Sequence, residues 1–476
     1  MTSALRLFST VGSIFLLCIL LCACSGDSPW RYNPGMPDVP AGLTAAAGNG
    51  QVTLSWPAVG TAAAYNVYYS TSPSVSRTAG IKIANVVSTS CIVSGLTNDT
   101  TFYFVITSVN SSGESAESNP ASATPALPGP YVQGDLEGTW DFNVLVSGTG
   151  AGWMRGRLVV SGTGSVAFSS FLDSAGNSQP PAGLFPQLFL SPTGTVRDGN
   201  SGTATFLAEL SLNREMIVGI SSPLGASRYL AVLQKQVPGI AFSIAGDIQG
   251  FGSTGGGGRR FIYNQISSGA SQEWEFAAGQ IGKDQKIQYT TFNAPSNPVK
   301  PGDKASMFTI SGDGIVTESF TAVLPQPATV IDRGVMSADK SVIIGTATDT
   351  SGGSPRYILR IYQLVNILSN DPNTFAPADL AGTYSLHKLL CGANTLSASG
   401  TMTIDASGSA AFSSYADSSG SSVLPPDVSL AMDGSGTLTT AADPTLLGKF
   451  SYFKDMFVVT MTDAPGSYSL SIALKR

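Results

Sequence analysis

The feature that most constrains this fold is a diverged internal repeat, which occupies the chain from about residue 131 onwards. The opening glycines of the three copies are Gly138, Gly250 and Gly382, so the two periods differ in length. Repeats of this kind predict three copies of one structural unit. The copies begin with the related segments YVQGDLEGTWDFN, FSIAGDIQGFGST and FAPADLAGTYSLH, and they also end alike, as in REMIVGISSPLGASRYLAVLQK and KDMFVVTMTDAPGSYSLSIALKR.

Each copy has the pattern of about eight short strands and no helix. In the first copy, Trp140, Phe142 and Val144 alternate with polar residues, which is the two-residue period of a β-strand. The links between strands are short, and short links favour an antiparallel meander. The strands expected in this copy lie near residues 138–147, 153–162, 165–172, 185–191, 195–198, 203–211, 215–221 and 227–235.

Two all-β architectures fit these three tandem repeats. Each copy can form its own small barrel or sandwich, and a closed barrel leaves no exposed sheet edge. Alternatively, each copy makes two four-stranded blades, and the three copies together make one six-bladed β-propeller. The unequal periods and the Pro/Asn-rich joint NILSNDPNTFAPA favour separate units. The opening Gly-Thr-Trp and the eight strands also loosely resemble the calycin barrels, the group of lipocalins and avidins.

Short alternating strands also occupy residues 37–125. In QVTLSW, the residues Val52, Leu54 and Trp56 share one face, and AYNVYYS and TTFYFVITSVN repeat the pattern. Strands of this length between turn residues indicate a β-sandwich. Together with the Gly95-Leu96 pair, they resemble a fibronectin type III domain. In bacterial proteins that resemblance implies a spacer or interaction module, and it concerns architecture more than activity.

The N-terminus is expected to be a targeting segment. One positive charge precedes an apolar run that is shorter than the roughly 20 residues of a membrane span. The run ends in LCAC at residues 21–24, which resembles the lipobox of bacterial lipoproteins. The resemblance implies that Cys24 is the lipidation site, and Ser25 after it favours delivery to the outer membrane. We therefore expect a lipoprotein of the bacterial cell envelope, attached to the membrane by its N-terminal lipid.

The predicted organisation follows from these patterns. The segments are a lipoprotein signal peptide (1–24), a tether (25–36), a fibronectin type III-like domain (37–125), a linker (126–134), β-repeat 1 (135–236), β-repeat 2 (237–366) and β-repeat 3 (367–476).

Charge and cysteine content exclude several classes of function. The net charge is −6 and the chain has no Lys/Arg-rich run, so a nucleic-acid partner is not expected, because phosphate binding needs a basic face. Three of the five cysteines lie in the first 24 residues. The other two, Cys91 and Cys391, are far apart and do not form a disulfide framework, so we expect two buried thiols.

No constellation of catalytic residues stands out, and we expect a protein that is not an enzyme. The single histidine, His387, aligns with Asn143 on the polar side of a first strand, so we expect it on the surface. A Ser-His-Asp site would have to include this residue. The segment from Gly250 to Gly255 matches G-x-G-x-x-G, but no helix follows it, and we interpret it as a loop. Neither a metal nor a cofactor is expected, because one histidine and scattered cysteines supply too few ligands.

Recurring aspartates are further candidates for a functional site. Asp135, Asp247 and Asp379 recur at the entries of the copies, and Asp173 and Asp417 recur in Asp-Ser-x-Gly segments. Such residues are typically turn formers, although weak calcium binding or paired-carboxylate catalysis would use the same residue type.

Two tryptophan segments add further expectations. In the strand around Trp274, we expect Glu273 and Glu275 to face solvent while the tryptophan packs inward. Trp153 could stack on a sugar, but a core or rim position is the preferred interpretation.

Two functional hypotheses follow. The first is a non-enzymatic envelope lipoprotein that acts in surface adhesion, scaffolding or protein interaction. The alternative is an extracytoplasmic protein that binds a ligand or carbohydrate, with a protein or glycan partner at the cell surface. A third hypothesis is a hydrolase built on the recurring aspartates.

Overall fold

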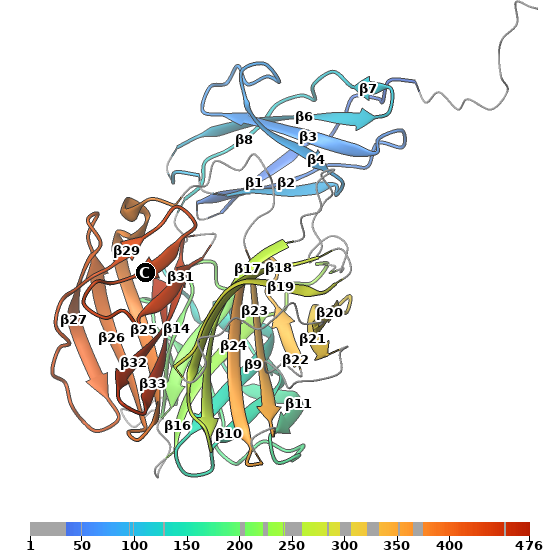
Figure 1. The fold of residues 1–476 in the computed structure, drawn as a ribbon. Helices are drawn as coiled ribbons and strands as arrows, with labels where there is room; N and C mark the ends of the chain where they lie inside the picture. Colours follow the sequence, from blue (N-terminus) through green and yellow to red (C-terminus); the bar gives the residue numbers. More distant parts are fainter. Residues whose placement is uncertain are drawn as a thin grey trace, which may run out of the picture.

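The computed structural model describes residues 35–476 apart from 49, 95, 99, 127–128, 200–204, 222–226, 241, 243–258, 283–284, 296–305, 321–332, 351–352, 365–374 and 452–453. Figure 1 shows a small β-sandwich at one end of the molecule and three larger β-sheet units gathered at the other. Within the described part, the secondary structure consists of strands and short 3₁₀ helices, with no α-helix. The all-β prediction is therefore confirmed.

The sandwich consists of a three-stranded sheet, β1-β2-β5, facing a sheet in the order β4-β3-β6-β7, with β8 also paired to β6. Trp56 and Tyr65 meet edge to face in the core between the sheets, with ring centroids 5.3 Å apart. The strands are β1 (Thr44–Gly48), β2 (Gln51–Ser55), β3 (Ala64–Ser70), β4 (Ile81–Val86), β5 (Ser90–Ser94), β6 (Phe102–Asn110), β7 (Gly113–Glu114) and β8 (Ala121–Ala123).

The first repeat forms a unit that we call barrel 1. Its eight strands lie within a few residues of the expected positions. They are β9 (Gly138–Ser147), β10 (Gly152–Val160), β11 (Val166–Asp173), β12 (Leu188–Leu190), β13 (Thr195–Asp198), β14 (Phe206–Leu210), β15 (Met216–Ser221) and β16 (Arg228–Lys235), preceded by the 3₁₀ helix η1 (Gln133–Leu136).

The other two repeats form barrels 2 and 3 with the same order of strands, except that two short strands of barrel 3 take the place of the single fourth strand. Barrel 2 contains β17 (Arg259–Gly269), β18 (Trp274–Ile281), β19 (Ile287–Asn293), β20 (Ser306–Ile310), β21 (Ile315–Phe320), β22 (Arg333–Met336), β23 (Val342–Asp349) and β24 (Arg356–Leu364). Barrel 3 contains η3 (Pro377–Leu380), β25 (Gly382–Gly392), β26 (Leu396–Ile404), β27 (Ser409–Asp417), β28 (Val428–Ser429), β29 (Ala431–Met432), β30 (Thr437–Thr439), β31 (Leu447–Phe450), β32 (Met456–Ala464) and β33 (Ser467–Lys475).

Each unit is a nearly closed antiparallel barrel. The first and last strands of each repeat pair with each other, as β9 does with β16, β17 with β24 and β25 with β33. The third and fourth strands meet only at one end, through the bridges Ser165–Gln187 and Lys286–Met307 and the short β27–β28 ladder. A bulge recurs between the second and third strands of all three barrels, where it bends the sheet towards closure. Separate units are confirmed, and the six-bladed propeller is wrong.

The interior of each barrel is filled by side chains. In barrels 1 and 3, a buried leucine of the 3₁₀ helix packs against the first strand, and its carbonyl oxygen accepts a hydrogen bond from Trp140 Nε1 (2.8 Å) or from the Tyr384 hydroxyl (2.9 Å). Barrel 2 has an aromatic interior instead, in which the rings of Phe261, Tyr263 and Tyr362 contact one another. Because these interiors are packed with side chains, their strands carry the two-residue period seen in the sequence.

The outer faces of the first, seventh and eighth strands are also apolar, and they pack together into one core shared by the three barrels. Burying a Val, Leu or Ile side chain contributes about 1.5–3 kcal/mol, so this core joins the barrels into one body. Its buried members are Leu145, Met216, Val218, Ile220, Leu230, Val232, Ile266, Val342, Ile344, Leu359, Ile361, Leu389, Cys391, Met456, Val458, Leu470, Ile472 and Leu474.

The shared core also fixes which positions are equivalent in the three barrels. Leu145, Ile266 and Leu389 occupy the same place on the first strand of each barrel. In this register, Arg259 of barrel 2 is equivalent to Gly138 of barrel 1. The sequence alignment that placed the start of barrel 2 at Gly250 is therefore wrong. Gly250 lies outside the described residues. The structural periods are therefore nearly equal, because the sequence alignment had followed a Gly-rich segment rather than the strand.

Candidate functional site

The barrels meet along three equivalent interfaces, and two of them are closed by large side chains. Between barrels 1 and 2, Trp153 on β10 donates a hydrogen bond from Nε1 to Thr348 Oγ1 (2.8 Å), and Arg155 lies 4.1 Å above its ring. Asn143 on β9 donates a long hydrogen bond to the carbonyl oxygen of Ile344 (3.4 Å). Trp153 is only 5% exposed, so it belongs to an interface core and not to an exposed sugar-stacking surface.

Barrels 2 and 3 repeat this arrangement. Trp274 on β18 donates from Nε1 to Thr462 Oγ1 (2.8 Å), and Phe276 beside it is buried. Asn264 donates from Nδ2 to the carbonyl oxygen of Leu447 (2.9 Å) and to Thr460 Oγ1 (3.0 Å). This interface is apolar around the tryptophan and satisfies the asparagine side-chain donor.

The interface between barrels 3 and 1 departs from this pattern. The residues that pair with the equivalent core positions Leu145, Ile266 and Leu389 are Trp153, Trp274 and Ser397. Two residues further along the second strand, the equivalents are Arg155, Phe276 and Ser399. Serine thus replaces both large side chains in barrel 3, and small residues leave space where the other interfaces are filled.

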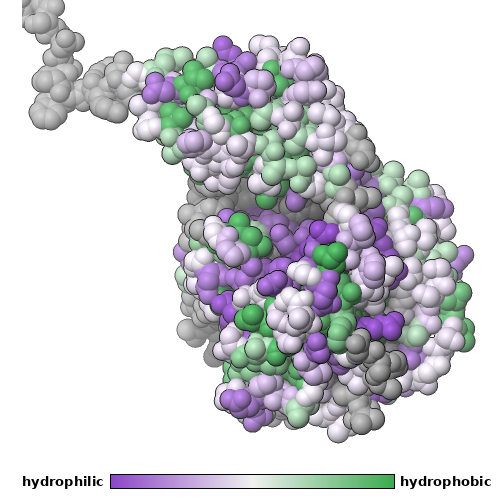
Figure 2. Space-filling view, turned by 180° about the vertical axis from the view of Figure 1, so that it is seen from behind, coloured by the Kyte–Doolittle hydropathy of each residue, from purple (hydrophilic) through white to green (hydrophobic). Residues whose placement is uncertain are grey.

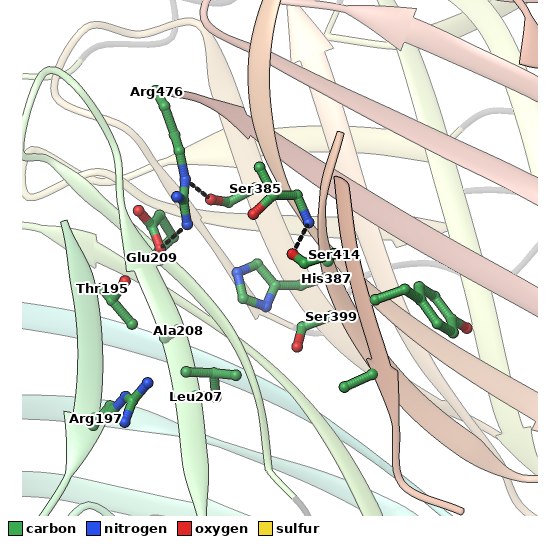
Figure 3. A pocket seen from close by; sticks show the side chains of 14 residues that line it. Thr195, Arg197, Leu207, Ala208, Glu209, Ser385, His387, Ser399, Ser414 and Arg476 are labelled. Atoms are coloured by element: carbon green, nitrogen blue, oxygen red, sulfur yellow. Dashed lines mark hydrogen bonds and ion pairs between the residues drawn. The ribbon is translucent and has the colours of Figure 1, made fainter. Parts of the chain in front are cut away.

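A cavity of about 270 Å³ occupies this space (Figure 3). Its walls are the outer faces of β13 and β14 of barrel 1 and of β25, β26 and β27 of barrel 3, together with the side chain of the last residue. The lining residues are Thr195, Arg197, Leu207, Ala208, Glu209, Ser385, His387, Ser399, Gly400, Thr401, Ser414, Tyr415, Ala416 and Arg476.

His387 faces this cavity, so the prediction of a surface histidine is wrong. It does point outward from its own barrel, as the alignment with Asn143 predicted, but barrel 1 covers that face and leaves His387 only 3% exposed. Barrel 1 carries Ile220 at the position equivalent to Thr460, so it offers no hydroxyl there. Neither ring nitrogen of His387 has a hydrogen-bond partner among the described residues. Burial, reinforced by the charge of Arg476, lowers the pKa of His387 to about 3.

Glu209 supplies the carboxylate of the cavity. Its Oε2 atom lies 3.4 Å from Arg476 Nη2, and Arg476 also donates a hydrogen bond from Nε to the Ser385 hydroxyl. Burial raises the pKa of Glu209 to about 7, although Arg476 and the hydroxyls of Thr195 and Ser385 oppose the shift. This ion pair bridges barrel 1 to barrel 3 across one wall of the cavity (Figure 3).

These groups do not form a catalytic triad among the described residues. A triad needs a hydrogen bond between a nucleophile and an imidazole, and a second one between that imidazole and a carboxylate. In the described residues, His387 makes neither bond, and Glu209 is engaged by Arg476. The cavity instead combines an imidazole without a partner, two guanidinium groups, one carboxylate and several hydroxyls, which can all take part in holding a polar ligand.

The recurring aspartates are turn formers, as the sequence indicated. Asp173 Oδ1 accepts hydrogen bonds from the backbone amides of Ala175 (2.9 Å) and Asn177 (2.8 Å), and Asp417 serves its own turn in the same way. Asp135 and Asp379 accept from backbone amides at the two 3₁₀ helices. Asp247 lies outside the described residues. Within the described part of the chain, no three acidic, histidine or cysteine residues lie together in a way that could hold a metal ion.

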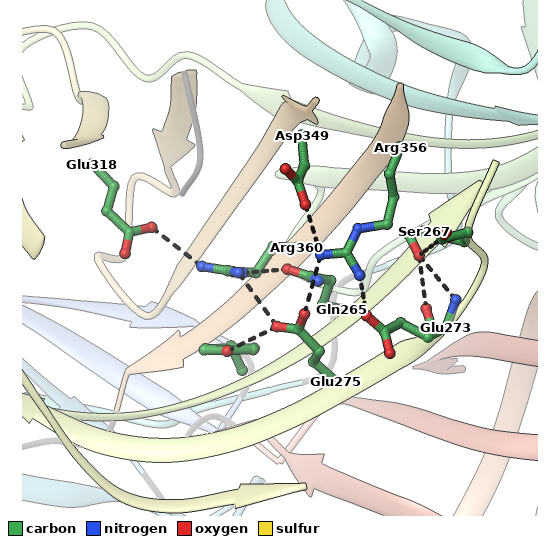
Figure 4. A network of polar contacts seen from close by, with 10 residues as sticks. Gln265, Ser267, Glu273, Glu275, Glu318, Asp349, Arg356 and Arg360 are labelled. Carbon is green, nitrogen blue, oxygen red and sulfur yellow. Dashed lines mark hydrogen bonds and ion pairs between the residues drawn. The ribbon is translucent and has the colours of Figure 1, made fainter. Parts of the chain in front are cut away.

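The prediction for Glu273 and Glu275 is wrong, because both take part in a buried network at the second strand of barrel 2 (Figure 4). Glu275 points into the barrel, 3.6 Å from the fully buried Arg360, while Glu273 pairs with Arg356. Trp274 faces the other way, towards barrel 3. The alternating pattern correctly placed the tryptophan and the two glutamates on opposite faces of the strand. The solvent-facing assignment of the glutamates was wrong, because both faces of this strand are buried, one by the interior of barrel 2 and the other by barrel 3.

Other sequence predictions concern the cysteines and the N-terminus. Cys91 and Cys391 are free thiols, and burial raises the pKa of each to about 12. Cys391 is buried in the shared core, whereas Cys91 is half-buried. Cys24 and the Gly250–Gly255 segment lie outside the described residues. Among the described residues, no helix has the length and apolar character needed to span a membrane.

Sequence reasoning missed the cavity and its charged residues, Arg197, Glu209 and Arg476. A signal was nevertheless present in the repeats. The second strand carries a tryptophan in barrels 1 and 2 but Ser397 in barrel 3, and the single histidine replaces an asparagine of the other copies. The positions at which barrel 3 departs from the other two repeats therefore lie at the interface that contains the cavity.

Comparison with known proteins identifies the sandwich. Residues 38–124 match the fibronectin type III domain family, and a Fn3-like protein from Clostridium thermocellum is 29% identical over 20% of this chain and 99% of its own, with a TM-score of 0.17. No curated protein matches the sequence.

Among solved structures, the chain resembles two transferrin binding proteins B. The protein from Neisseria meningitidis is 8% identical, covering 92% of this chain and 78% of its own, with a TM-score of 0.20. The mutant protein from Haemophilus parasuis is 9% identical, covering 78% and 82%, with a TM-score of 0.22. The family match shows that residues 38–124 are a fibronectin type III domain.

Proposed function

We propose that this chain is a non-enzymatic binding protein of the bacterial cell envelope, whose three-barrel body holds a small polar ligand in the cavity between barrels 3 and 1. The observation that carries the proposal is the imidazole of His387, which is 3% exposed and faces the cavity without a hydrogen-bond partner among the described residues. A buried polar group left without a partner costs about 1–3 kcal/mol, and a ligand that bonds to it recovers this free energy.

The remaining parts of the chain support an extracytoplasmic role. Cys24, the last residue of the lipobox-like segment, is the proposed site of a lipid anchor. Two acyl chains on this residue would give stable membrane attachment. The fibronectin type III domain then separates the barrels from the membrane. Incorporation of a labelled fatty acid tests the anchor. We expect the full chain to take up label and to sediment with membranes, and a Cys24→Ala variant that is labelled equally would contradict the proposal.

A second candidate function is surface adhesion, scaffolding or protein interaction. It is favoured by the fibronectin type III domain and by the shared core, which makes the barrels one rigid body. On the face seen in Figure 2, hydrophobic residues occur in small, separated groups. A protein partner on that face would therefore be held mainly by polar contacts, since large docking surfaces usually expose a continuous apolar patch.

The ligand-binding proposal is tested by filling the cavity. Ser399→Phe places in barrel 3 the ring that Phe276 supplies at the equivalent position of barrel 2. A screen of small polar compounds by thermal shift should find ligands that raise the Tm of the wild type but not that of Ser399→Phe. Ser170→Phe, at an exposed position on β11, is the control and should respond like the wild type. If the compounds stabilise all three proteins equally, the cavity is not their site.

A further inference from the structure

We infer that the cavity selects a small, singly charged carboxylate that also carries hydroxyl groups, of the chemical class of a sugar acid. This inference rests on the proposed function and adds the class of ligand. It follows from the charges, the hydroxyls and the size of the cavity, considered in turn.

The charges favour an anion. The charged residues lining the cavity are Arg197, Glu209 and Arg476. Arg197 has no hydrogen-bond or ion-pair partner among the described residues, and it lies on β13 with its side chain at the cavity (Figure 3). Arg476 is paired with Glu209, whose raised pKa leaves that carboxyl only partly ionised near pH 7. The cavity therefore has a net positive charge, although the whole chain carries −6.

The same residues favour a single negative charge. The guanidinium group of Arg197 and an imidazole N–H both donate hydrogen bonds, which a carboxylate accepts. A doubly charged phosphate would also be attracted by the two arginines. It would, however, be repelled by the Glu209 carboxylate more strongly than a singly charged ligand, because like charges in one site destabilise each other.

The hydroxyl groups favour a hydroxylated ligand. Five of the lining residues are serine or threonine, and each hydroxyl offers one donor and two acceptor sites. Some of this capacity is used, since Ser385 accepts from Arg476 and Ser414 Oγ accepts from the amide of Thr401 (3.1 Å). The rest can bond to ligand hydroxyls. The five residues are Thr195, Ser385, Ser399, Thr401 and Ser414.

The size of the cavity limits the ligand to one small ring. Its volume of about 270 Å³ is just below the range of about 300–1,000 Å³ that is usual for sites of drug-sized ligands. A free sugar acid and a uronate at the end of a polysaccharide present the same chemistry to such a site. A comparison of glucuronate with a short oligosaccharide that ends in glucuronate separates these two sources, and binding of either supports the inference.

The single histidine makes the test direct, because a chain labelled at histidine gives the ring signals of His387 alone. Glucuronate, glucose, acetate and inorganic phosphate are titrated into the full chain while these signals are followed by NMR. We expect glucuronate to shift them at concentrations roughly tenfold lower than glucose, acetate or phosphate. Arg197→Met, which removes an exposed side chain, should weaken glucuronate binding about tenfold, because a charge-assisted bond is worth about 1.4 kcal/mol or more.

Three further outcomes separate this inference from the proposed function. If glucose binds as tightly as glucuronate and Arg197→Met changes neither, the ligand is a neutral sugar, and only the inference of an acid is overturned. If acetate binds as tightly as glucuronate, the role of the hydroxyls is overturned. If none of these probes, nor any compound of the wider screen, moves the His387 signals, the proposed function fails as well.

Discussion

At the scale of single residues, equivalent positions in the three barrels show how one substitution changes an interface. Asn143 and Asn264 donate hydrogen bonds across their interfaces, whereas His387 at the same position has no hydrogen-bond partner among the described residues. An asparagine in a packed interface is satisfied by a neighbouring carbonyl or hydroxyl. The larger imidazole lies instead beside a cavity, where it remains available to a ligand.

The ionisation of His387 can be predicted from its burial. Its folded pKa of about 3 lies below the 6.5 of an exposed histidine, so the unfolded chain takes up the proton first as the pH falls. His387 therefore contributes stability above about pH 6.5, and this contribution is lost as the pH falls towards 3. NMR titration of the labelled histidine should show a neutral ring from pH 7 down to pH 5. A ring that titrates near 6.5 would contradict its burial.

The network inside barrel 2 gives a second prediction at this scale. Arg360 donates hydrogen bonds to Gln265 Oε1 (2.7 Å) and Glu318 Oε2 (3.2 Å), and it lies 3.6 Å from Glu275 (Figure 4). Arg360→Ala should lower the free energy of unfolding by about 3–5 kcal/mol, because it removes a fully buried cation that the carboxyls of Glu275 and Glu318 share. Chemical denaturation measures the loss. Arg197→Met is the control, and an equal loss there would show that the network has no special role.

At the scale of elements, the second strand of each barrel decides how tightly the next barrel packs. β10 and β18 each insert a tryptophan whose indole N–H bonds to a threonine of the neighbouring barrel. β26 carries Ser397 at this place. The three strands differ by at most one residue in length and pair in the same register with the first strand, so the difference lies in their side chains.

This contrast predicts opposite effects of two substitutions. Trp274→Ala should lower the free energy of unfolding by about 3–5 kcal/mol, because it opens a cavity in a packed interface and leaves Thr462 without its donor. Ser399→Phe fills existing space and should cost less than about 1 kcal/mol, or stabilise the protein, provided that the ring fits as it does at Phe276. Denaturant unfolding compares both variants with the wild type. A large loss from Ser399→Phe would show that the cavity is narrower than its volume indicates.

At the scale of the whole molecule, the shared core makes the three barrels depend on one another. The hairpins between the sixth and seventh strands carry Glu215, Asp339 and Asp455, one acidic residue from each barrel, and these residues repel one another. The pKa of Glu215 is raised to about 7. Burial is the largest cause of this shift, and the negative charges of the two aspartates add to it. Burial likewise raises the pKa of Asp455 to about 6.

These shifts predict a dependence of stability on pH. The folded chain keeps a proton on Glu215 that the unfolded chain releases with a pKa of about 4.5. Protonation of Glu215 therefore contributes stability to the folded state that is complete below pH 4.5 and is lost as the pH rises through 7. In a His387→Asn background, which removes the opposing histidine effect, the Tm should be higher at pH 5 than at pH 8. Adding Glu215→Gln should reduce this difference. If the difference is unchanged, Glu215 is not responsible for it.

Part of the fold and little of the site could be predicted. The strands of barrel 1 and the fibronectin type III domain follow from alternation and turn residues, which are local properties of the chain. The turn role of Asp173 and Asp417 was equally local. The cavity was not predictable in this way, because it joins Glu209 of barrel 1 to His387 of barrel 3, and no local pattern relates them.

The pattern of amino acids was sufficient to predict that the chain is all-β, that it contains three copies of one unit of about eight strands, and which residues share a face of a strand. The reason is that a strand exposes alternate residues on opposite sides whatever surrounds it. What covers those faces became clear from the packing of the barrels. The outer face that holds His387, and the strand that holds Glu275, are polar by sequence and yet buried, because the barrels pack against one another and a buried polar group is stable where it finds partners or space for a ligand.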